Sequence, residues 1–229
     1  MKPTNNKRFL CTDVSSSYSE SFQQLQVNLD FSFIDESKRV IAITSAIVGE
    51  GKSTVTANLA YIYSRKGSKV IVLDLDLRRP TIHRFFGLTN DKGITDYCAK
   101  QATKEEIIKH YETIDIITAG TKTPFPGKVL ESKSLLNLVS ELKEKYDYVL
   151  IDTPPMLLTS DPKICSSFVS QYLLVVNYGK TKKTEFDEAI NQFKNNENMV
   201  LAGVVMTKVK LAKKGYYNYQ YQYYNRRDD

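Results

Sequence analysis

The sequence of 229 residues has few of the side chains from which zinc sites and hydrolase triads are built. Its three cysteines, Cys11, Cys98 and Cys165, are widely spaced and match no metal-binding or redox motif, so we expect reduced thiols. The two histidines, His83 and His110, do not cluster with cysteine or with paired carboxylates. A zinc site and a Ser-His-Asp hydrolase are therefore not expected, and the chemistry must come from carboxylates, lysine and backbone amides.

Long apolar segments are also missing. No run of about 18 apolar residues occurs, and the segment MKPTNNKRFL at 1–10 lacks the apolar run of a signal peptide. With 41% hydrophobic and 25% charged residues, the composition is that of a globular chain, and the length suits one domain with an appendage. These features predict a cytoplasmic location.

The chain has a net charge of +6, and its positive charge is concentrated in two short segments. A solvated basic face, contact with an anionic membrane and contact with an acidic partner all fit this pattern. Nucleic acid is not expected as a partner, because no recognised binding motif accompanies the charge. The first cluster contains Lys180, Lys182 and Lys183, and the second contains Lys208, Lys210, Lys213 and Lys214.

Strand-like apolar runs alternate with helical patterns along most of the chain. Near-continuous Val/Ile/Leu runs separated by helices predict a doubly wound, mostly parallel α/β sheet with helices on both faces. Phe22, Leu25, Leu29 and Phe33 recur at helical spacing and predict an amphipathic helix before this sheet. We expect a flexible arm at 1–16, one domain at 17–207 and a basic, tyrosine-rich tail at 208–229. The apolar runs lie at 40–44, 69–75, 114–118, 148–152, 172–177 and 200–206, and further helices are expected at 132–146 and 184–195.

A phosphate-binding loop follows the first predicted strand. The segment SAIVGEGKST at 45–54 is a glycine turn that opens a helix near Lys52. Such a turn directs several backbone N–H groups at one anion, and the helix N-terminus adds positive potential. Lys52 would meet the terminal phosphates of a nucleotide and the Ser53 hydroxyl would ligate Mg²⁺, while Ala46 replaces the usual first glycine. The expected nucleotide-binding residues are Gly49, Glu50, Gly51, Lys52, Ser53 and Thr54.

Acidic residues close two of the predicted strands. Asp74 and Asp76 end the second run, and residues two apart on an extended strand point the same way. Asp152 closes the fourth run. The carboxyl ends of parallel strands share one edge of the sheet, so these acids are expected beside the phosphate loop, where they predict Mg²⁺ binding and a base. Arg78 and Arg79 fit three alternative roles: balancing the acids, gripping a phosphate group, or forming a structural ion pair.

The tail carries six tyrosines in a short polar segment, GYYNYQYQYYN at 215–225. With almost no aliphatic residues beside them, these tyrosines cannot form a core. Phosphate acceptors, an adhesive aromatic tail and stacking on a base or sugar are the alternatives that the composition leaves open. The tyrosines are Tyr216, Tyr217, Tyr219, Tyr221, Tyr223 and Tyr224.

The loop, the acids and the tail together resemble the bacterial tyrosine kinases, the autokinases that regulate capsular and exopolysaccharide synthesis. The resemblance implies that Lys52 and Ser53 form the Walker A pair, Asp74 and Asp76 the Walker A′ acids, and Asp152 the Walker B acid. It also implies ATP and Mg²⁺ as cofactors, with Asp74 as the base that takes the tyrosine proton. Lys52 and Asp76 are the other expected catalytic residues, and the expected metal ligands are Ser53, Asp76 and Asp152.

Partners follow from the same resemblance. The six tail tyrosines would be phosphorylated in trans within a homo-oligomer, because a tail beyond the last strand reaches a neighbouring site more easily than its own. Each phosphate adds a charge of about −1.5 to −2, which would loosen the assembly. A kinase domain of this family without membrane spans implies a transmembrane activator of the polysaccharide co-polymerase type, which would hold the protein at the inner face of the membrane. A cognate tyrosine phosphatase is the remaining expected partner.

Four positions depart from related patterns. Gln23 and Gln26 replace the two arginines that the family uses for subunit contacts, and Thr207 replaces an asparagine that contacts adenine. The nearest competitors, the partition-type ATPases, carry an extra lysine where this chain has Ile47. A partition-type ATPase and a catalytically weak nucleotide-binding scaffold remain the alternatives.

Overall fold

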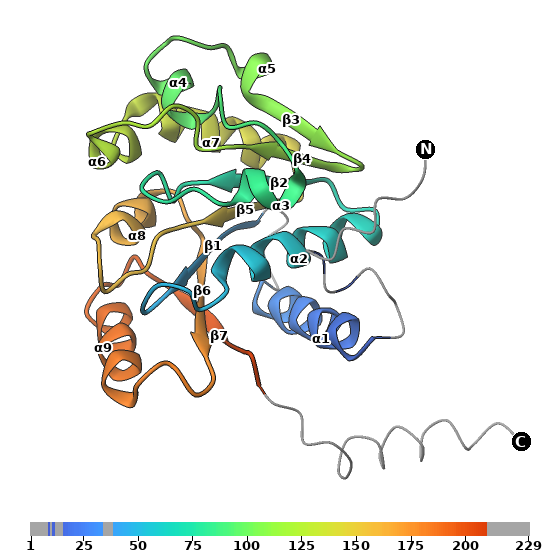
Figure 1. Ribbon diagram of the computed structural model, residues 1–229, viewed down its shortest axis with the longest axis vertical. Coiled ribbons are helices and arrows are strands. Elements are labelled where there is room, and N and C mark those ends of the chain that lie inside the picture. Colours follow the sequence, from blue (N-terminus) through green and yellow to red (C-terminus); the bar gives the residue numbers. More distant parts are fainter. Residues whose placement is uncertain (1–8, 10, 12–15, 34–38, 210–229) are drawn as a thin grey trace, which may run out of the picture.

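The computed structural model describes residues 9, 11, 16–33 and 39–209, and it contains a seven-stranded sheet (Figure 1). The strand order is β3-β4-β2-β5-β1-β6-β7, and every pairing is parallel except the antiparallel one between β3 and β4. The predicted fold class is confirmed. The strands are β1 (Arg39–Ser45), β2 (Val70–Asp74), β3 (Ile108–Tyr111), β4 (Ile114–Ile117), β5 (Tyr148–Asp152), β6 (Gln171–Asn177) and β7 (Leu201–Thr207).

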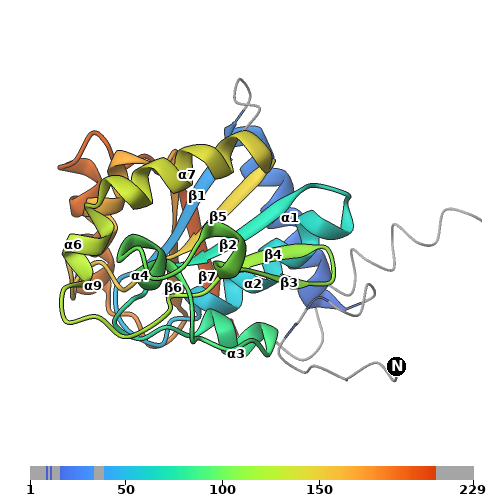
Figure 2. The ribbon, with the colours of Figure 1, turned by 90° about the horizontal axis from the view of Figure 1, so that it is seen from above.

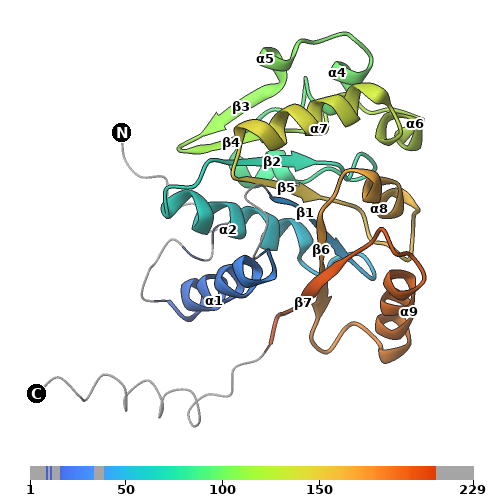
Figure 3. The ribbon, with the colours of Figure 1, turned by 180° about the vertical axis from the view of Figure 1, so that it is seen from behind.

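Helices cover both faces of the sheet, as Figures 2 and 3 show from two further directions. One core lies between the sheet and α7 and α9, and the other lies between the sheet and α1, α2 and α3. The central strands are buried on both faces, which explains why their sequences are continuous apolar runs instead of alternating ones. The helices are α1 (Ser17–Ser32), α2 (Lys52–Arg65), α3 (Ile82–Phe86), α4 (Ile94–Cys98), α5 (Lys104–Ile107), α6 (Pro126–Leu130), α7 (Lys133–Lys145), α8 (Asp161–Ile164) and α9 (Lys183–Lys194), with a 3₁₀ turn at Cys165–Ser167.

Helix α1 is capped by a serine at its N-terminus and is held to the sheet by a polar hub. The Ser16 hydroxyl accepts from the Ser19 N–H at 3.1 Å, which caps the helix. Near the other end, Asp30 Oδ1 accepts hydrogen bonds from Arg39 at 2.8 Å, from Tyr63 at 3.1 Å and from Tyr148 at 2.6 Å. The rings of Tyr63 and Tyr148 stack with centroids 3.6 Å apart. One carboxylate therefore joins α1 to α2, β1 and β5.

The two glutamines that replace arginines on α1 lie in different environments. Gln26 is buried, and its amide donates to Asp30 while its oxygen accepts from Lys66. Gln23 is exposed. Gln26 is thus part of the attachment of α1 to its own domain, and Gln23 is the member of the pair that faces outward.

Parts of both predicted appendages lie outside the described residues. These parts include the six tail tyrosines and most of the predicted arm. Three residues of the predicted arm are described: Phe9, Cys11 and the α1 cap Ser16. Phe9 and Cys11 are buried, since Phe9 packs its ring against Tyr61, Phe86 and Tyr111, and the Cys11 thiol donates to Asn58 Oδ1 at 3.1 Å. Within the described part of the chain, no helix is both long and apolar enough to span a membrane.

The Asp30 hub yields a stability prediction. Replacing Asp30 with Ala removes the shared acceptor of Arg39, Tyr63 and Tyr148, so the free energy of unfolding should fall by about 2 kcal/mol. The matched control is Asp187→Ala on α9, which breaks an exposed ion pair with Lys183 and should cost less than about 0.5 kcal/mol. Chemical denaturation measures both, and equal losses in the two variants would contradict the role of the hub.

Candidate nucleotide-binding site

The loop between β1 and α2 has the backbone of an anion site. Gly49 and Gly51 have φ angles of 78° and 100°, a left-handed conformation that strongly favours glycine. Gly51 is also the N-cap of α2 and has no side chain with which to cap the helix. The first backbone N–H groups of α2 are therefore available to a ligand, as the sequence predicts.

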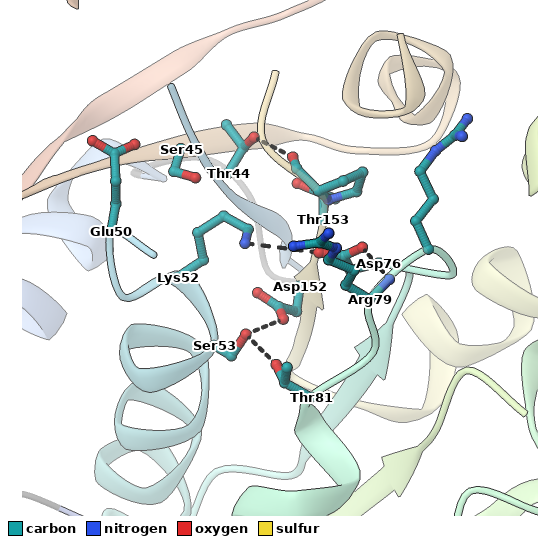
Figure 4. A network of polar contacts seen from close by, with 12 residues as sticks. Thr44, Ser45, Glu50, Lys52, Ser53, Asp76, Arg79, Thr81, Asp152 and Thr153 are labelled. Carbon is teal, nitrogen blue, oxygen red and sulfur yellow. Dashed lines mark hydrogen bonds and ion pairs between the residues drawn. The ribbon is translucent and has the colours of Figure 1, made fainter. Parts of the chain in front are cut away.

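Side chains from three elements meet beside this loop (Figure 4). The Lys52 ammonium lies 3.8 Å from Asp76 Oδ2, and the Ser53 hydroxyl donates to Asp152 Oδ2 at 2.5 Å. Thr81, just before α3, donates its hydroxyl to Ser53 Oγ at 2.6 Å. The structure thus brings the predicted lysine, serine and acids together and adds Thr81, which lies outside the predicted motifs.

Two of the acids face each other across adjacent strands. Asp74 and Asp152 are paired in the register of β2 and β5, and both are fully buried. Burial and the nearby charge of Asp152 raise the pKa of Asp74 well above its usual value. Burial also raises the pKa of Asp152 to about 6, although Lys52 and the Ser53 hydroxyl oppose this shift. Ionising both acids therefore costs free energy that the neighbouring groups of the protein do not fully offset.

Asp74 is held firmly by backbone donors. Its Oδ2 accepts from the N–H groups of Thr81 and Ile82, each at 3.0 Å, and its Oδ1 accepts from the Asp76 N–H at 3.2 Å. Burial raises the pKa of Asp76 as well, and Lys52 lowers it. Asp76 is 6% exposed, whereas Asp74 is fully buried. Of the two acids, Asp76 is the closer one to Lys52.

The two arginines after Asp76 have separate roles. Arg78 forms a two-point ion pair with the buried carboxylate of Asp161, at 2.7 Å from Nε and 3.0 Å from Nη2. Arg79 is exposed, and its backbone N–H donates to Asp76 Oδ1 at 3.0 Å. For Arg78, the structural ion pair is the alternative that the structure supports. It ties the turn after β2 to α8.

Two of the predicted loop residues make contacts away from the Lys52 ammonium. The Glu50 carboxylate is fully buried and accepts from the Ile47 N–H at 2.8 Å. Thr54 is partly buried, and its carbonyl accepts from the Asn58 side chain at 2.8 Å. The Thr207 hydroxyl donates to the Glu50 carbonyl at 2.6 Å. Glu50 and Thr54 can therefore offer a nucleotide their backbone N–H groups, and the Thr207 hydroxyl is engaged with the loop.

The donors at this site suit Mg²⁺ held together with a nucleotide. The described residues contain no cluster of three or more His, Cys, Asp or Glu that would enclose a metal by themselves. Mg²⁺ does not need one, because it commonly keeps several waters and takes the remaining ligands from one or two protein oxygens and from phosphates. The Ser53 hydroxyl and the carboxylates of Asp152 and Asp76 are oxygen donors of this kind. A bound cation would also favour the ionised forms of Asp74 and Asp152, whose pKa values are raised in the protein alone.

A glycine loop with a lysine at the helix start, placed beside acids at the carboxyl ends of parallel strands, defines a P-loop nucleotide-binding protein. Residues 38–202 match the AAA domain family. The tyrosine-protein kinase YwqD of Bacillus subtilis (strain 168) is 35% identical over 210 residues, which cover 91% of this chain and 88% of that protein. The chain belongs to this family of bacterial tyrosine-protein kinases.

Solved structures agree with this assignment. The kinase domain of the Escherichia coli tyrosine kinase ETK superposes with a TM-score of 0.83 at 27% identity, over 90% of this chain and 82% of that one. The septum site-determining protein MinD from Pyrococcus horikoshii OT3, solved with Mg-ADP, superposes with a TM-score of 0.61 at 26% identity, over 73% of this chain and 69% of that one. The fold is thus shared with proteins that bind nucleotide and Mg²⁺.

The raised pKa of Asp152 predicts a pH-dependent stability of the nucleotide-free protein. An unfolded Asp titrates near pH 3.9, so between about pH 4 and about pH 6 the folded state binds more protons than the unfolded state. The stability from this group is fully present below pH 4 and is lost as the pH rises toward 6. Relative to the native chain, the free energy of unfolding of Asp152→Asn should therefore rise by roughly 1–3 kcal/mol between pH 4 and pH 7.

The measurement is denaturant unfolding of both proteins across this pH range without nucleotide or Mg²⁺. Asp187→Asn on α9 serves as the control, because its carboxylate lies at the surface. If the stabilities of Asp152→Asn and the native chain change in parallel with pH, the raised pKa of Asp152 is contradicted.

Proposed function

We propose that the protein is an ATP- and Mg²⁺-dependent tyrosine autokinase that phosphorylates its own C-terminal tyrosines in trans. The observation that carries the proposal is the contact of the P-loop lysine with the acids. The Lys52 ammonium lies 3.8 Å from Asp76, whose N–H donates to Asp74 at the end of β2. Phosphoryl transfer depends on positioning and on neutralising charge, and this arrangement offers both. The six tail tyrosines remain the proposed acceptors and lie outside the described residues.

In the proposed reaction, the phenolic oxygen of a tail tyrosine bonds to the γ-phosphorus of ATP while the bond to the β–γ bridging oxygen breaks and ADP leaves. Lys52 and the N–H groups of the loop hold the phosphates, and Ser53, Asp76 and Asp152 supply oxygens for Mg²⁺. Asp74 accepts the proton of the phenol. Its raised pKa suits this role, because it makes the Asp74 carboxylate a stronger base than an aspartate in water.

The proposal extends to location and partners. We infer a homo-oligomer that lies at the inner face of the membrane through a transmembrane activator and acts in capsular or exopolysaccharide synthesis, with a tyrosine phosphatase to reverse its modification. Membership of the bacterial tyrosine-protein kinases supports this inference. The exposed basic cluster at Lys180, Lys182 and Lys183 offers a surface for an acidic segment of the activator.

A partition-type ATPase is the second candidate, supported by the likeness to MinD. Against it, Ile47 stands where those ATPases carry the lysine that reaches a neighbouring subunit. The structure places Lys180 and Lys208 on the carbonyls of Val48 and Gly49, at 2.7 Å and 3.2 Å. Lysines therefore do approach the loop, but they donate to its own backbone.

The first test of the proposed function is intact mass spectrometry after incubation with Mg-ATP. The native chain should gain mass in steps of one phosphate, mapped to residues 216–224. Lys52→Met should abolish the gain, because it removes the positive charge beside the phosphates, and Lys194→Met, at an exposed site on α9, should leave it unchanged. ATP consumption without added mass would favour the partition-type ATPase. If the chain neither consumes ATP nor gains mass, even when a membrane activator is supplied, a scaffold is favoured.

The assignment of the base is tested by comparing two conservative variants. Asp74→Asn removes the proposed proton acceptor and should lower the rate of transfer by about 10²–10⁴-fold, with little change in the affinity for Mg-ADP. Asp76→Asn removes a metal oxygen and the partner of Lys52, so it should weaken Mg-ADP binding. Single-turnover kinetics and nucleotide titration separate the two effects. Full transfer by Asp74→Asn with none by Asp76→Asn would make Asp76 the base.

A further inference from the structure

The Glu50 carboxylate is fully buried, although Glu50 belongs to the phosphate loop. In Figure 4 it points away from the ammonium of Lys52. We propose that Glu50 is a positioning residue, whose side chain clamps the phosphate loop to the turn between β6 and α9 and so fixes the loop in its phosphate-binding shape. This inference rests on the proposed nucleotide site and assigns a further residue to it.

The carboxylate joins two segments that are far apart in the sequence. Oε2 accepts from the Ile47 N–H at 2.8 Å, which closes the loop on itself. Oε1 accepts from the Thr181 hydroxyl and from the Asn177 N–H, the latter at 3.4 Å. The Thr181 hydroxyl in turn accepts from the same Asn177 N–H at 2.9 Å. The clamp therefore consists of Glu50, Ile47, Asn177 and Thr181.

The backbone of Glu50 is anchored as well. Its carbonyl accepts from the Thr207 hydroxyl at 2.6 Å, and Thr207 also donates to the Val176 carbonyl at 3.2 Å. A Cβ added to Gly51 would lie 3.5 Å from the Thr207 methyl carbon, so β7 packs directly against the turn. The outer side of the loop is thus held by the ends of β6 and β7, and its inner side faces Lys52 and the acids.

The chemistry of the clamp requires a carboxylate. All its partners are donors, namely the N–H groups of Ile47 and Asn177 and the hydroxyl of Thr181. An ionised carboxylate only accepts hydrogen bonds, whereas an amide of the same shape would turn an NH₂ group toward one of these donors. Glutamine at position 50 would therefore keep the size of the side chain and break the pattern of the clamp.

The placement of the clamp also resolves an electrostatic conflict. A carboxylate within a phosphate loop repels the phosphates that the loop binds. The Glu50 carboxylate lies on the side of the loop away from Lys52, and Lys180 and Lys208 bring positive charge to Val48 and Gly49. Glu50 can thus stabilise the loop while its charge is kept apart from the ligand.

The test measures the dissociation constant of Mg-ADP for the full chain by titration calorimetry, together with KM for ATP and kcat of autophosphorylation. Glu50→Gln should raise the dissociation constant and KM about tenfold and leave kcat within about twofold. Thr181→Val should raise both constants by a smaller factor, because it removes one donor. Thr181→Ser keeps the hydroxyl and should behave like the native chain. In the double variant Glu50→Gln/Thr181→Val, the losses should not add, because both substitutions break the same clamp.

Three results would overturn the proposal: unchanged Mg-ADP affinity in Glu50→Gln and Thr181→Val, equal behaviour of Thr181→Ser and Thr181→Val, or a loss confined to kcat. If Glu50→Gln does not fold, the comparison of the two Thr181 variants decides the question. The calorimetric measurement needs no kinase activity, so it tests the clamp separately from the proposed function. A native chain that does not bind Mg-ADP contradicts the proposed function, and native binding with unaffected variants contradicts the clamp alone.

Discussion

The repulsion between Asp74 and Asp152 is the constraint around which the site is built. The register of β2 and β5 places these buried carboxylates side by side at the carboxyl ends of two central strands. Lys52 lowers the pKa of Asp152, the Ser53 hydroxyl donates to it, and three backbone N–H groups hold Asp74. These contacts reduce the cost of the paired charges without removing it, since both pKa values stay raised. A cation that arrives with its ligand would offset the remaining cost of ionising both acids.

Much of this arrangement could be predicted from the sequence, because it depends on local patterns. The glycine loop, the acids at the strand ends and α1 with its apolar spacing all occur where those patterns place them. Strand β3 was missed because it has only four residues, two of which are Lys109 and His110, so it lacks an apolar run. It also pairs antiparallel to β4, which the alternation of strands and helices does not predict.

Local sequence patterns do not predict contacts between distant segments. Thr81 meets Ser53, Asp161 meets Arg78 and Thr181 meets Glu50 only after the sheet has brought their turns together. Glu50 is an example of a residue whose motif is local but whose contacts are not. Its place in the motif predicts contact with a nucleotide, but the direction of its side chain depends on donors at 177 and 181 that no local pattern identifies. Gln26 is similar, since only its contacts with Asp30 and Lys66 show that it faces its own domain.

The antiparallel strand β3 has a consequence for how copies of this chain can meet. Among the described strands, β3 and β7 form the two edges of the sheet. β3 is short and carries Lys109 and His110, which hinder the addition of another strand. β7 has seven residues and none is charged, and its Val204 and Met206 side chains are 43% and 55% exposed. A continuous sheet shared between two copies could therefore form along β7, whereas β3 disfavours growth in both directions, as in a fibril.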